Sequence, residues 1–290
     1  MVTTIAVHSH KGGTGKSIIA VNLAGILAVK GYRVVILDMD LAAPTLQTYF
    51  PYDPKKRTLT EYFLGEEIPV DQLIQDVSSK LPENAKGKLF AGLSSIDGGM
   101  ISKIDQRGRT APLNDLYRLI GLVRNKLVEN PWNADFVVLD TSPGVSMSSI
   151  NNVAVAEHLF IIQKLINADL AGTVELLKII HQSLRPNTSI IVNQLPEKFV
   201  RHKGTSINDL IQGKVINPLD RPNIWFGGVI NHDEFLIENE IAYVYDSLTN
   251  PHNFGREIYS LKYPDRPFSI SINNVLERFL EIHKNQEVND

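Results

Sequence analysis

The chain has 290 residues, of which 43% are hydrophobic and 21% are charged, with a formal net charge of −3. These values are ordinary for a globular protein and argue against a surface coated with basic DNA-binding residues, although they are compatible with a local basic patch. The chain contains no cysteine, which excludes disulfides and thiolate metal sites. No apolar run approaches the ~20 residues of a membrane span, and a strand is expected almost at the first residue, so we expect a cytoplasmic protein without a signal peptide.

The first motif is a glycine-rich loop between a predicted strand and a predicted helix. Thr3 to Val7 is an apolar, β-branched run, and the pattern from Ser17 to Lys30 is helical. Between them lies Lys-Gly-Gly-Thr-Gly-Lys-Ser, from Lys11 to Ser17. In such a loop backbone N–H groups surround a phosphate chain, Lys16 can reach the β- and γ-phosphates, and the Ser17 hydroxyl can bind Mg²⁺.

The loop departs from the strict phosphate-loop pattern at one position. That pattern has a glycine where this chain has His10. The chain carries instead a second lysine, Lys11, beside a double glycine. Two lysines on one tight loop would repel each other unless polyphosphate neutralised them, which favours phosphate binding over a simple surface turn.

Lys11 to Ser17 resembles the deviant Walker A loop of the ParA/MinD family of P-loop ATPases. The resemblance implies ATP and Mg²⁺ as cofactors. It makes Lys11 the signature lysine, which in the family contacts nucleotide across the interface of an ATP-sandwiched homodimer. It also implies that nucleotide is bound by Gly12, Gly13, Thr14, Gly15, Lys16, Ser17 and Ile18.

A pair of aspartates follows the second predicted strand, Arg33 to Leu37. Asp38 and Asp40 would lie at the carboxyl end of a parallel strand, where open α/β sheets bind ligands. Together with Pro44 they resemble the first switch of the family. The resemblance implies that Asp40 orients the attacking water and that Asp38 lies near Mg²⁺.

The region after this switch is less informative. We expect a strand over Lys88 to Leu93 and no regular element over Ser94 to Arg109, which lacks a periodic pattern. Short helices are expected over Thr45–Phe50, Thr58–Leu64 and Val70–Val77. Several aromatic residues here could line a partner surface, but packing against the sheet is the favoured interpretation: they are Tyr49, Phe50, Tyr52, Tyr62 and Phe63.

A second strand-end carboxylate follows the amphipathic helix predicted over Leu113 to Val128. Phe136 to Leu139 is an apolar run that ends in Asp140, which is the Walker B pattern for a Mg²⁺ carboxylate. The following Thr141 to Gly144 resembles the second switch of the family. The loop and the Walker B pattern predict Ser17 and Asp140 as residues of the metal site, and the resemblance adds Asp38.

Three further strands are predicted, over His158–Gln163, Ser189–Asn193 and Phe226–Asn231, with a helix over Asn167–Leu184. The resemblance implies that Asn193 bonds the adenine ring. Residues 197–222 form a polar, basic stretch that we interpret as a solvated loop, with a nucleic-acid or acidic-partner patch as the alternative.

The alternation of strands and helices predicts one doubly wound α/β P-loop NTPase domain over residues 1–290, with a mainly parallel sheet flanked by helices. A terminal helix at about 270–284 is amphipathic. Its polar face is close to neutral, because Glu277 and Glu281 offset Arg278 and Lys284. Membrane binding favours a basic face, so we expect this helix to pack on the sheet, unlike the membrane helix of MinD proteins.

These observations predict a Mg²⁺-dependent ATPase, with Lys11, Lys16 and Asp40 as catalytic residues, that acts as an ATP-driven dimerisation switch to position or partition a cellular cargo. Expected partners are a second copy and an activating protein. Membrane is a weaker candidate, and DNA binding would need a patch from dispersed residues: Lys198, Arg201, Lys203, Arg256, Lys262 and Arg266.

Two other functions stay open: a nucleotide-dependent scaffold with negligible turnover, and a small-molecule phosphotransferase or ligase of the same fold. Lys11 counts against the second of these, because such single-site enzymes generally work without a lysine from a partner. The iron–sulfur branches of the family are excluded, since they need cysteines at the dimer interface.

Overall fold

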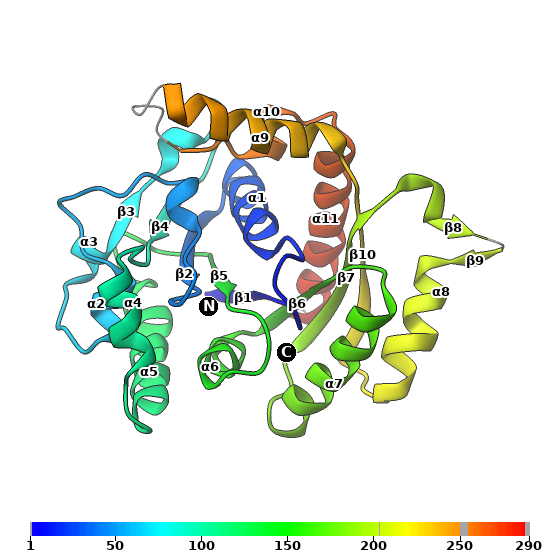
Figure 1. The fold of residues 1–290 in the computed structure, drawn as a ribbon, viewed down its shortest axis with the longest axis horizontal. Coiled ribbons are helices and arrows are strands. Elements are labelled where there is room, and N and C mark those ends of the chain that lie inside the picture. Colours follow the sequence, from blue (N-terminus) through cyan, green and yellow to red (C-terminus); the bar gives the residue numbers. More distant parts are fainter. Residues whose placement is uncertain (1, 203, 250–254, 288–290) are drawn as a thin grey trace.

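Strands and helices alternate along the chain in the computed structural model, which describes residues 2–202, 204–249 and 255–287. Within these residues a central sheet has the strand order β10-β7-β6-β1-β5-β2-β4-β3 (Figure 1). Its strands are β1 (Thr3–His8), β2 (Arg33–Met39), β3 (Ile74–Asp76), β4 (Lys88–Gly92), β5 (Phe136–Thr141), β6 (His158–Gln163), β7 (Asn187–Leu195) and β10 (Ile224–Asn231).

Every neighbouring pair in this sheet is parallel except β3 and β4 at the edge. The register places Val7 of β1 beside Asp140 of β5, and Asp140 beside Asp38 of β2. The carboxyl ends of these three adjacent strands therefore bring the glycine-rich loop and the two aspartates to one edge of the sheet.

Helices cover both faces of the sheet, which confirms the doubly wound α/β class (Figure 1). One face packs against α1 (Lys16–Val29), α10 (Tyr259–Lys262) and α11 (Pro267–Glu287). The other face packs against α5 (Ala111–Ile120), α6 (Met147–Val155), α7 (Asn167–Ser183) and α8 (Ile207–Ile211).

The central elements are buried on nearly all sides. All six residues of β1 are buried, as an apolar β-branched run in the middle of a parallel sheet requires. Small residues bring α1 close to its neighbours: a Cβ on Gly25 would lie 2.9 Å from Ile258, just before α10. The terminal helix α11 buries Phe268, Ile272 and Leu276 in the same core, so its predicted packing on the sheet is confirmed.

The region between β2 and β5 contains short elements, and two predictions there are wrong. The helix expected over Val70–Val77 ends at Leu73, and Ile74 pairs with Gly92 in an antiparallel strand that covers the sheet edge. The segment Ser94–Arg109 contains α4, because Asp97 caps it by accepting a hydrogen bond from Met100 N. The short helical elements are η1 (Leu46–Thr48), α2 (Leu59–Phe63), α3 (Val70–Leu73), η2 (Ser78–Lys80) and α4 (Gly98–Asp105).

Four of the five aromatic residues of this region pack inward, as the favoured interpretation predicted. Tyr49, Phe50, Tyr62 and Phe63 are buried, and Tyr52 is partly exposed. The helix predicted over Leu113–Val128 is present but changes character, because α5 continues into a π-helical segment η3 (Gly121–Lys126).

Residues 197–202 and 204–222 are structured and not simply a solvated loop, so that interpretation is wrong in part. Ile207, Ile211 and Val215 are buried in the core beneath β7 and β10. The short elements of the segment are η4 (Glu197–Phe199), the hairpin strands β8 (Arg201–His202) and β9 (Thr205–Ser206), η5 (Gln212–Ile216) and η6 (Asn217–Leu219). The helix α9 (Glu234–Thr249), which we did not predict, follows β10.

Candidate functional site

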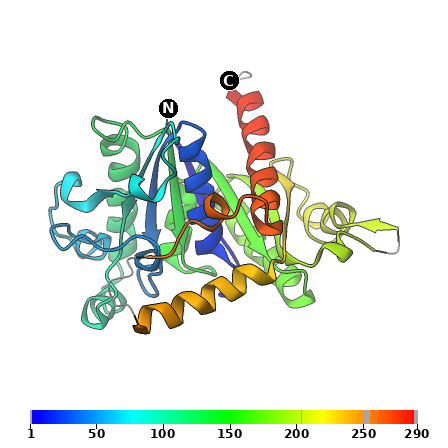
Figure 2. The ribbon, with the colours of Figure 1, turned by 90° about the horizontal axis from the view of Figure 1, so that it is seen from above.

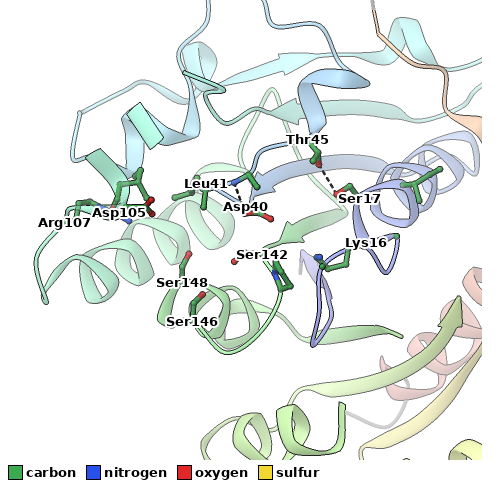
Figure 3. Close-up of a pocket in the computed structure, with 18 residues that line it drawn as sticks. Lys16, Ser17, Asp40, Leu41, Thr45, Asp105, Arg107, Ser142, Ser146 and Ser148 are labelled. Atoms are coloured by element: carbon green, nitrogen blue, oxygen red, sulfur yellow. Dashed lines mark hydrogen bonds between the residues drawn. The ribbon is translucent and has the colours of Figure 1, made fainter. Parts of the chain in front are cut away.

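The glycine-rich loop connects β1 to α1 and borders a cavity of about 830 Å³ (Figure 3). Gly13 and Gly15 have φ values of 73° and 94°, which other residues rarely adopt. Gly15 is the N-cap of α1, and no side chain caps the helix, so the N–H groups of its first turn are left for an anion. The predicted residues that line the cavity are Gly12, Gly13, Gly15, Lys16, Ser17, Ile18 and Asp40.

A buried hydrogen-bond network joins the carboxylates to the loop. Asp38 Oδ2 accepts hydrogen bonds from the backbone N–H groups of Thr45 (3.1 Å) and Leu46 (3.0 Å). Thr45 Oγ1 donates to Ser17 Oγ at 2.9 Å and lies 3.4 Å from Asp140 Oδ2. The first switch, the phosphate loop and the Walker B strand therefore meet at one point.

The residues of this network fit a divalent cation. Asp38 and Asp140 are fully buried, and the Oδ1 atom of each has no hydrogen-bond partner among the residues that the structure describes. Burial raises the pKa of Asp140 to about 6, and burial together with the charge of Asp140 raises the pKa of Asp38 well above its usual value. Mg²⁺ prefers such carboxylate and hydroxyl oxygens, and its charge would offset the cost of ionising both carboxyl groups.

Lys16 and Asp40 point into the same space, as Figure 3 shows. Lys16 is largely buried, and burial lowers its pKa, while the charges of Asp140 and Asp40 act in the opposite direction. Asp40 is half-buried, its Oδ1 accepts a hydrogen bond from Ala43 N at 3.1 Å, and burial raises its pKa. This carboxylate is thus held at the cavity wall with one side facing the open space.

The two lysines of the loop have different environments. Lys11 is not among the cavity-lining residues, and its side chain is 46% exposed. Its Nζ lies 3.5 Å from Asp169 in the first turn of α7. Lys16 therefore lines the cavity, whereas Lys11 lies at the molecular surface beside the cavity.

Asn193, at the carboxyl end of β7, contacts the phosphate loop directly. Its Nδ2 donates to Thr14 O at 2.7 Å, and its Oδ1 accepts from Gln194 N at 2.8 Å. The approach is close, since a Cβ on Gly15 would lie 2.4 Å from Nδ2 of Asn193. The side-chain amide thus braces the loop, and a contact of Asn193 with adenine stays a prediction.

Two histidines beside the loop, His8 and His10, were given no structural role by sequence reasoning. His8 Nδ1 lies 2.7 Å from Thr141 Oγ1, and His8 Nε2 donates to Gly144 O at 2.9 Å, so His8 joins β1 to the second switch. Burial lowers the pKa of His8 to about 4, which keeps it neutral. His10, where the strict pattern has glycine, packs so closely on α7 that a Cβ on Gly172 would lie 2.2 Å from its ring.

Arg107 is a further cavity-lining residue without a sequence motif. Its guanidinium forms two hydrogen bonds with the Asp115 carboxylate, at 2.7 and 2.8 Å. Asp115 offsets the charge of Arg107 and fixes the position of its guanidinium, and Arg107 lies across the cavity from Lys16 and Ser17 (Figure 3).

Three of the basic residues that we considered for DNA binding are held in ion pairs. Arg256 pairs with Glu240, Lys262 with Glu257 and Arg266 with Asp233. Lys203 lies outside the described residues, and Arg201 lies in β8. No helix in the part of the chain that the structure describes is long and apolar enough to cross a membrane.

A phosphate loop, two switch segments and a Walker B aspartate on a doubly wound sheet define a ParA/MinD-like P-loop ATPase, a class that uses ATP and Mg²⁺. Residues 2–191 match an AAA domain family, and the chain belongs to that family. The fold agrees with the septum site-determining protein MinD of Pyrococcus horikoshii, crystallised with Mg-ADP. The TM-score is 0.69, at 18% identity over 100% of this chain and 99% of that one.

Curated relatives are similar to this chain over different lengths. An uncharacterized ATP-binding protein of Methanocaldococcus jannaschii is 26% identical, over 74% of this chain and 73% of its own length. The cytosolic Fe–S cluster assembly factor CFD1 of Phaeosphaeria nodorum is 32% identical over 51% of this chain and 48% of its own. The chromosome-partitioning ATPase Soj of Treponema pallidum is 26% identical over 56% of each.

Proposed function

We propose that this protein is a Mg²⁺-dependent ATPase whose ATP-bound form closes a homodimer, and that this switch positions or partitions a cellular cargo. The observation that carries the proposal is that the two lysines of the loop have different environments. Lys16 points into the cavity, whereas Lys11 lies at the surface beside Asp169. The proposal is that Lys11 leaves this contact to bind a nucleotide held by a second copy.

The residues of the site suit phosphoryl transfer to water. Lys16 and the N–H groups of the first turn of α1 would offset the charge of the phosphates. Ser17, Asp38 and Asp140 would hold Mg²⁺, which when bound neutralises and orients phosphate oxygens. Asp40, held by Ala43 N at the cavity wall, would orient the attacking water.

Three variants test the dimerisation switch. Lys16→Ala should abolish nucleotide binding, because it removes the buried cation of the cavity. Asp40→Ala should still bind ATP and accumulate as a dimer, since it would lose only the group that orients water. Lys11→Ala should bind ATP as a monomer. Sedimentation in saturating ATP and Mg²⁺ checks all three, and a monomeric Asp40→Ala protein would refute the proposed switch.

For the role in partitioning a cargo, the support is the similarity to the chromosome-partitioning ATPase Soj. The similarity to CFD1 covers about half of each chain, and the present chain lacks the cysteines that a thiolate-bound cluster requires. Retardation of DNA by the Asp40→Ala protein tests whether the protein binds DNA. Binding with ATP but not ADP that weakens steeply with salt supports DNA positioning, and no binding in either state excludes it.

A further inference from the structure

Helix α9 turns an apolar face away from the rest of the protein. Ile237, Ile241, Val244 and Leu248 are between 49% and 75% exposed, and we refer to these four residues as the α9 seam. Figure 2 shows α9 as the gold-to-orange helix along the lower edge, with one side against the remaining chain. An amphipathic helix normally places such residues against the core, so the orientation of α9 calls for an explanation.

The inner side of α9 is firmly attached. The Phe235 ring packs edge-on against Tyr263 at 5.0 Å between centroids, and Arg266 lies over its other side at 4.7 Å. Asn239 Nδ2 donates to the Tyr263 hydroxyl at 3.2 Å, and Glu240 pairs with Arg256. The outward direction of the seam is therefore set by these inner contacts.

The seam residues have the spacing of a helix–helix interface. Positions 237, 241, 244 and 248 are four, three and four residues apart, which is the heptad spacing of apolar seam residues in paired helices. Single exposed apolar residues are common on protein surfaces, whereas an aligned row on one helix marks an interaction surface. The occupant that this spacing fits is another helix with its own apolar row.

The charge of α9 decides what kind of helix fits. Its charged residues are all acidic, and it contains no lysine, arginine or histidine. Glu240 is paired with Arg256 on the inner side. Glu234 and Glu238 are exposed, and Glu238 directly follows Ile237 of the seam. A second α9 would bring carboxylates against carboxylates, and an anionic lipid surface would repel the helix. A helix with lysine or arginine beside its apolar row would instead be attracted.

We propose that the α9 seam is the docking surface for a basic amphipathic helix of a partner protein. Docking there would occur next to the nucleotide site. Arg256, the partner of Glu240, donates from its backbone N to Thr48 O at 2.7 Å, and its guanidinium lies 5.4 Å from the Tyr49 ring centre. Thr48 and Tyr49 follow the Thr45 that bonds Ser17 and Asp38. The surface itself exists whether or not the protein hydrolyses ATP, so its test is independent of the proposed function.

The test uses a fluorescent peptide of about four heptads, with leucine at the seam positions and lysine beside them. A matched peptide has glutamate in place of lysine. Binding is measured by anisotropy on three full-length proteins: wild type, the double variant Ile241→Glu/Val244→Glu, and the control Ile179→Glu. Ile179 is similarly exposed but lies on α7. Because all substituted side chains are exposed, circular dichroism should confirm that each variant folds.

We expect the lysine peptide to bind the double variant at least about thirtyfold more weakly than the wild type, and Ile179→Glu within about twofold of the wild type. The glutamate peptide should bind the wild type at least about tenfold more weakly than the lysine peptide. Unchanged or tighter binding of the lysine peptide to the double variant would overturn the proposal, since charge alone would then explain the binding.

Two further outcomes would also overturn it. A nucleotide-free wild-type dimer that dissociates in the double variant would show that a second copy covers the seam. Binding of wild type to anionic vesicles that is lost in the double variant would show that the seam meets a membrane.

Discussion

Replacing Asp140 with asparagine should stabilise the nucleotide-free protein, even though it removes a proposed Mg²⁺ ligand. Asp140 is 1% exposed, and its neighbours Ser17 and Thr45 supply hydrogen bonds that an asparagine oxygen can still accept. The cost of burying the carboxylate exceeds what Ser17, Lys16 and Thr45 return, and a bound cation would offset the remainder.

The size of the effect follows from the pKa. Burial raises the pKa of Asp140 from 3.8 to about 6, a difference of about 2 units, which corresponds to about 3 kcal/mol. A raised pKa means that the folded state holds the proton more tightly than the unfolded state. Protonated Asp140 therefore favours the folded state. Its contribution to the free energy of unfolding is complete below about pH 4 and is lost as the pH rises through about 6. Because asparagine does not ionise, the free energy of unfolding of the Asp140→Asn protein does not fall in this way as the pH rises.

Urea denaturation of the wild type and Asp140→Asn, without nucleotide or Mg²⁺, checks this reasoning. The difference in free energy of unfolding should grow from about pH 4 and level off above about pH 7. Thermal denaturation should show a Tm rise of roughly 5 °C at the upper end of this range. The exposed Glu129→Gln substitution serves as the control and should change neither value. An Asp140→Asn protein that is no more stable than the wild type above about pH 7 would refute the assigned cost of burial.

Two further substitutions probe contacts with the phosphate loop. Gly172→Ala should displace His10 and lower the free energy of unfolding by about 1–3 kcal/mol, because the added Cβ would lie 2.2 Å from the ring; unchanged urea denaturation would contradict this. Asn193→Ala should weaken nucleotide binding and cost about 1–3 kcal/mol of stability, since Thr14 O loses its buried donor. Calorimetric titration with ATP checks the first effect, and an affinity equal to that of the wild type would mean that Asn193 does not brace the loop.

The local patterns of the sequence were sufficient for much of the fold. The helix predicted over Asn167–Leu184 appears as α7, because its apolar residues recur at helical spacing. The edge strand at Ile74–Asp76 could not be predicted, because three residues are too few to show a periodic pattern. Its formation also depends on β4, whose outer backbone groups would otherwise have no neighbouring strand to pair with. The interpretation of residues 197–222 as a solvated loop was wrong in part for a similar reason, because Ile207 and Ile211 are buried by contacts with residues that are distant in the sequence.

The sequence by itself determined where the phosphate loop and the two strand-end aspartates lie. Lys11 to Ser17 is one contiguous motif, and Asp38 and Asp140 each end an apolar run, so neighbours along the chain were enough to predict that they meet at one edge of the sheet. Tertiary structure alone decided which distant groups support that motif. Asn193 meets Thr14 across 179 residues, and His10 meets Gly172 on another helix. The outward direction of the α9 seam likewise depends on what packs against its inner side, and spacing along a helix does not specify which side faces solvent.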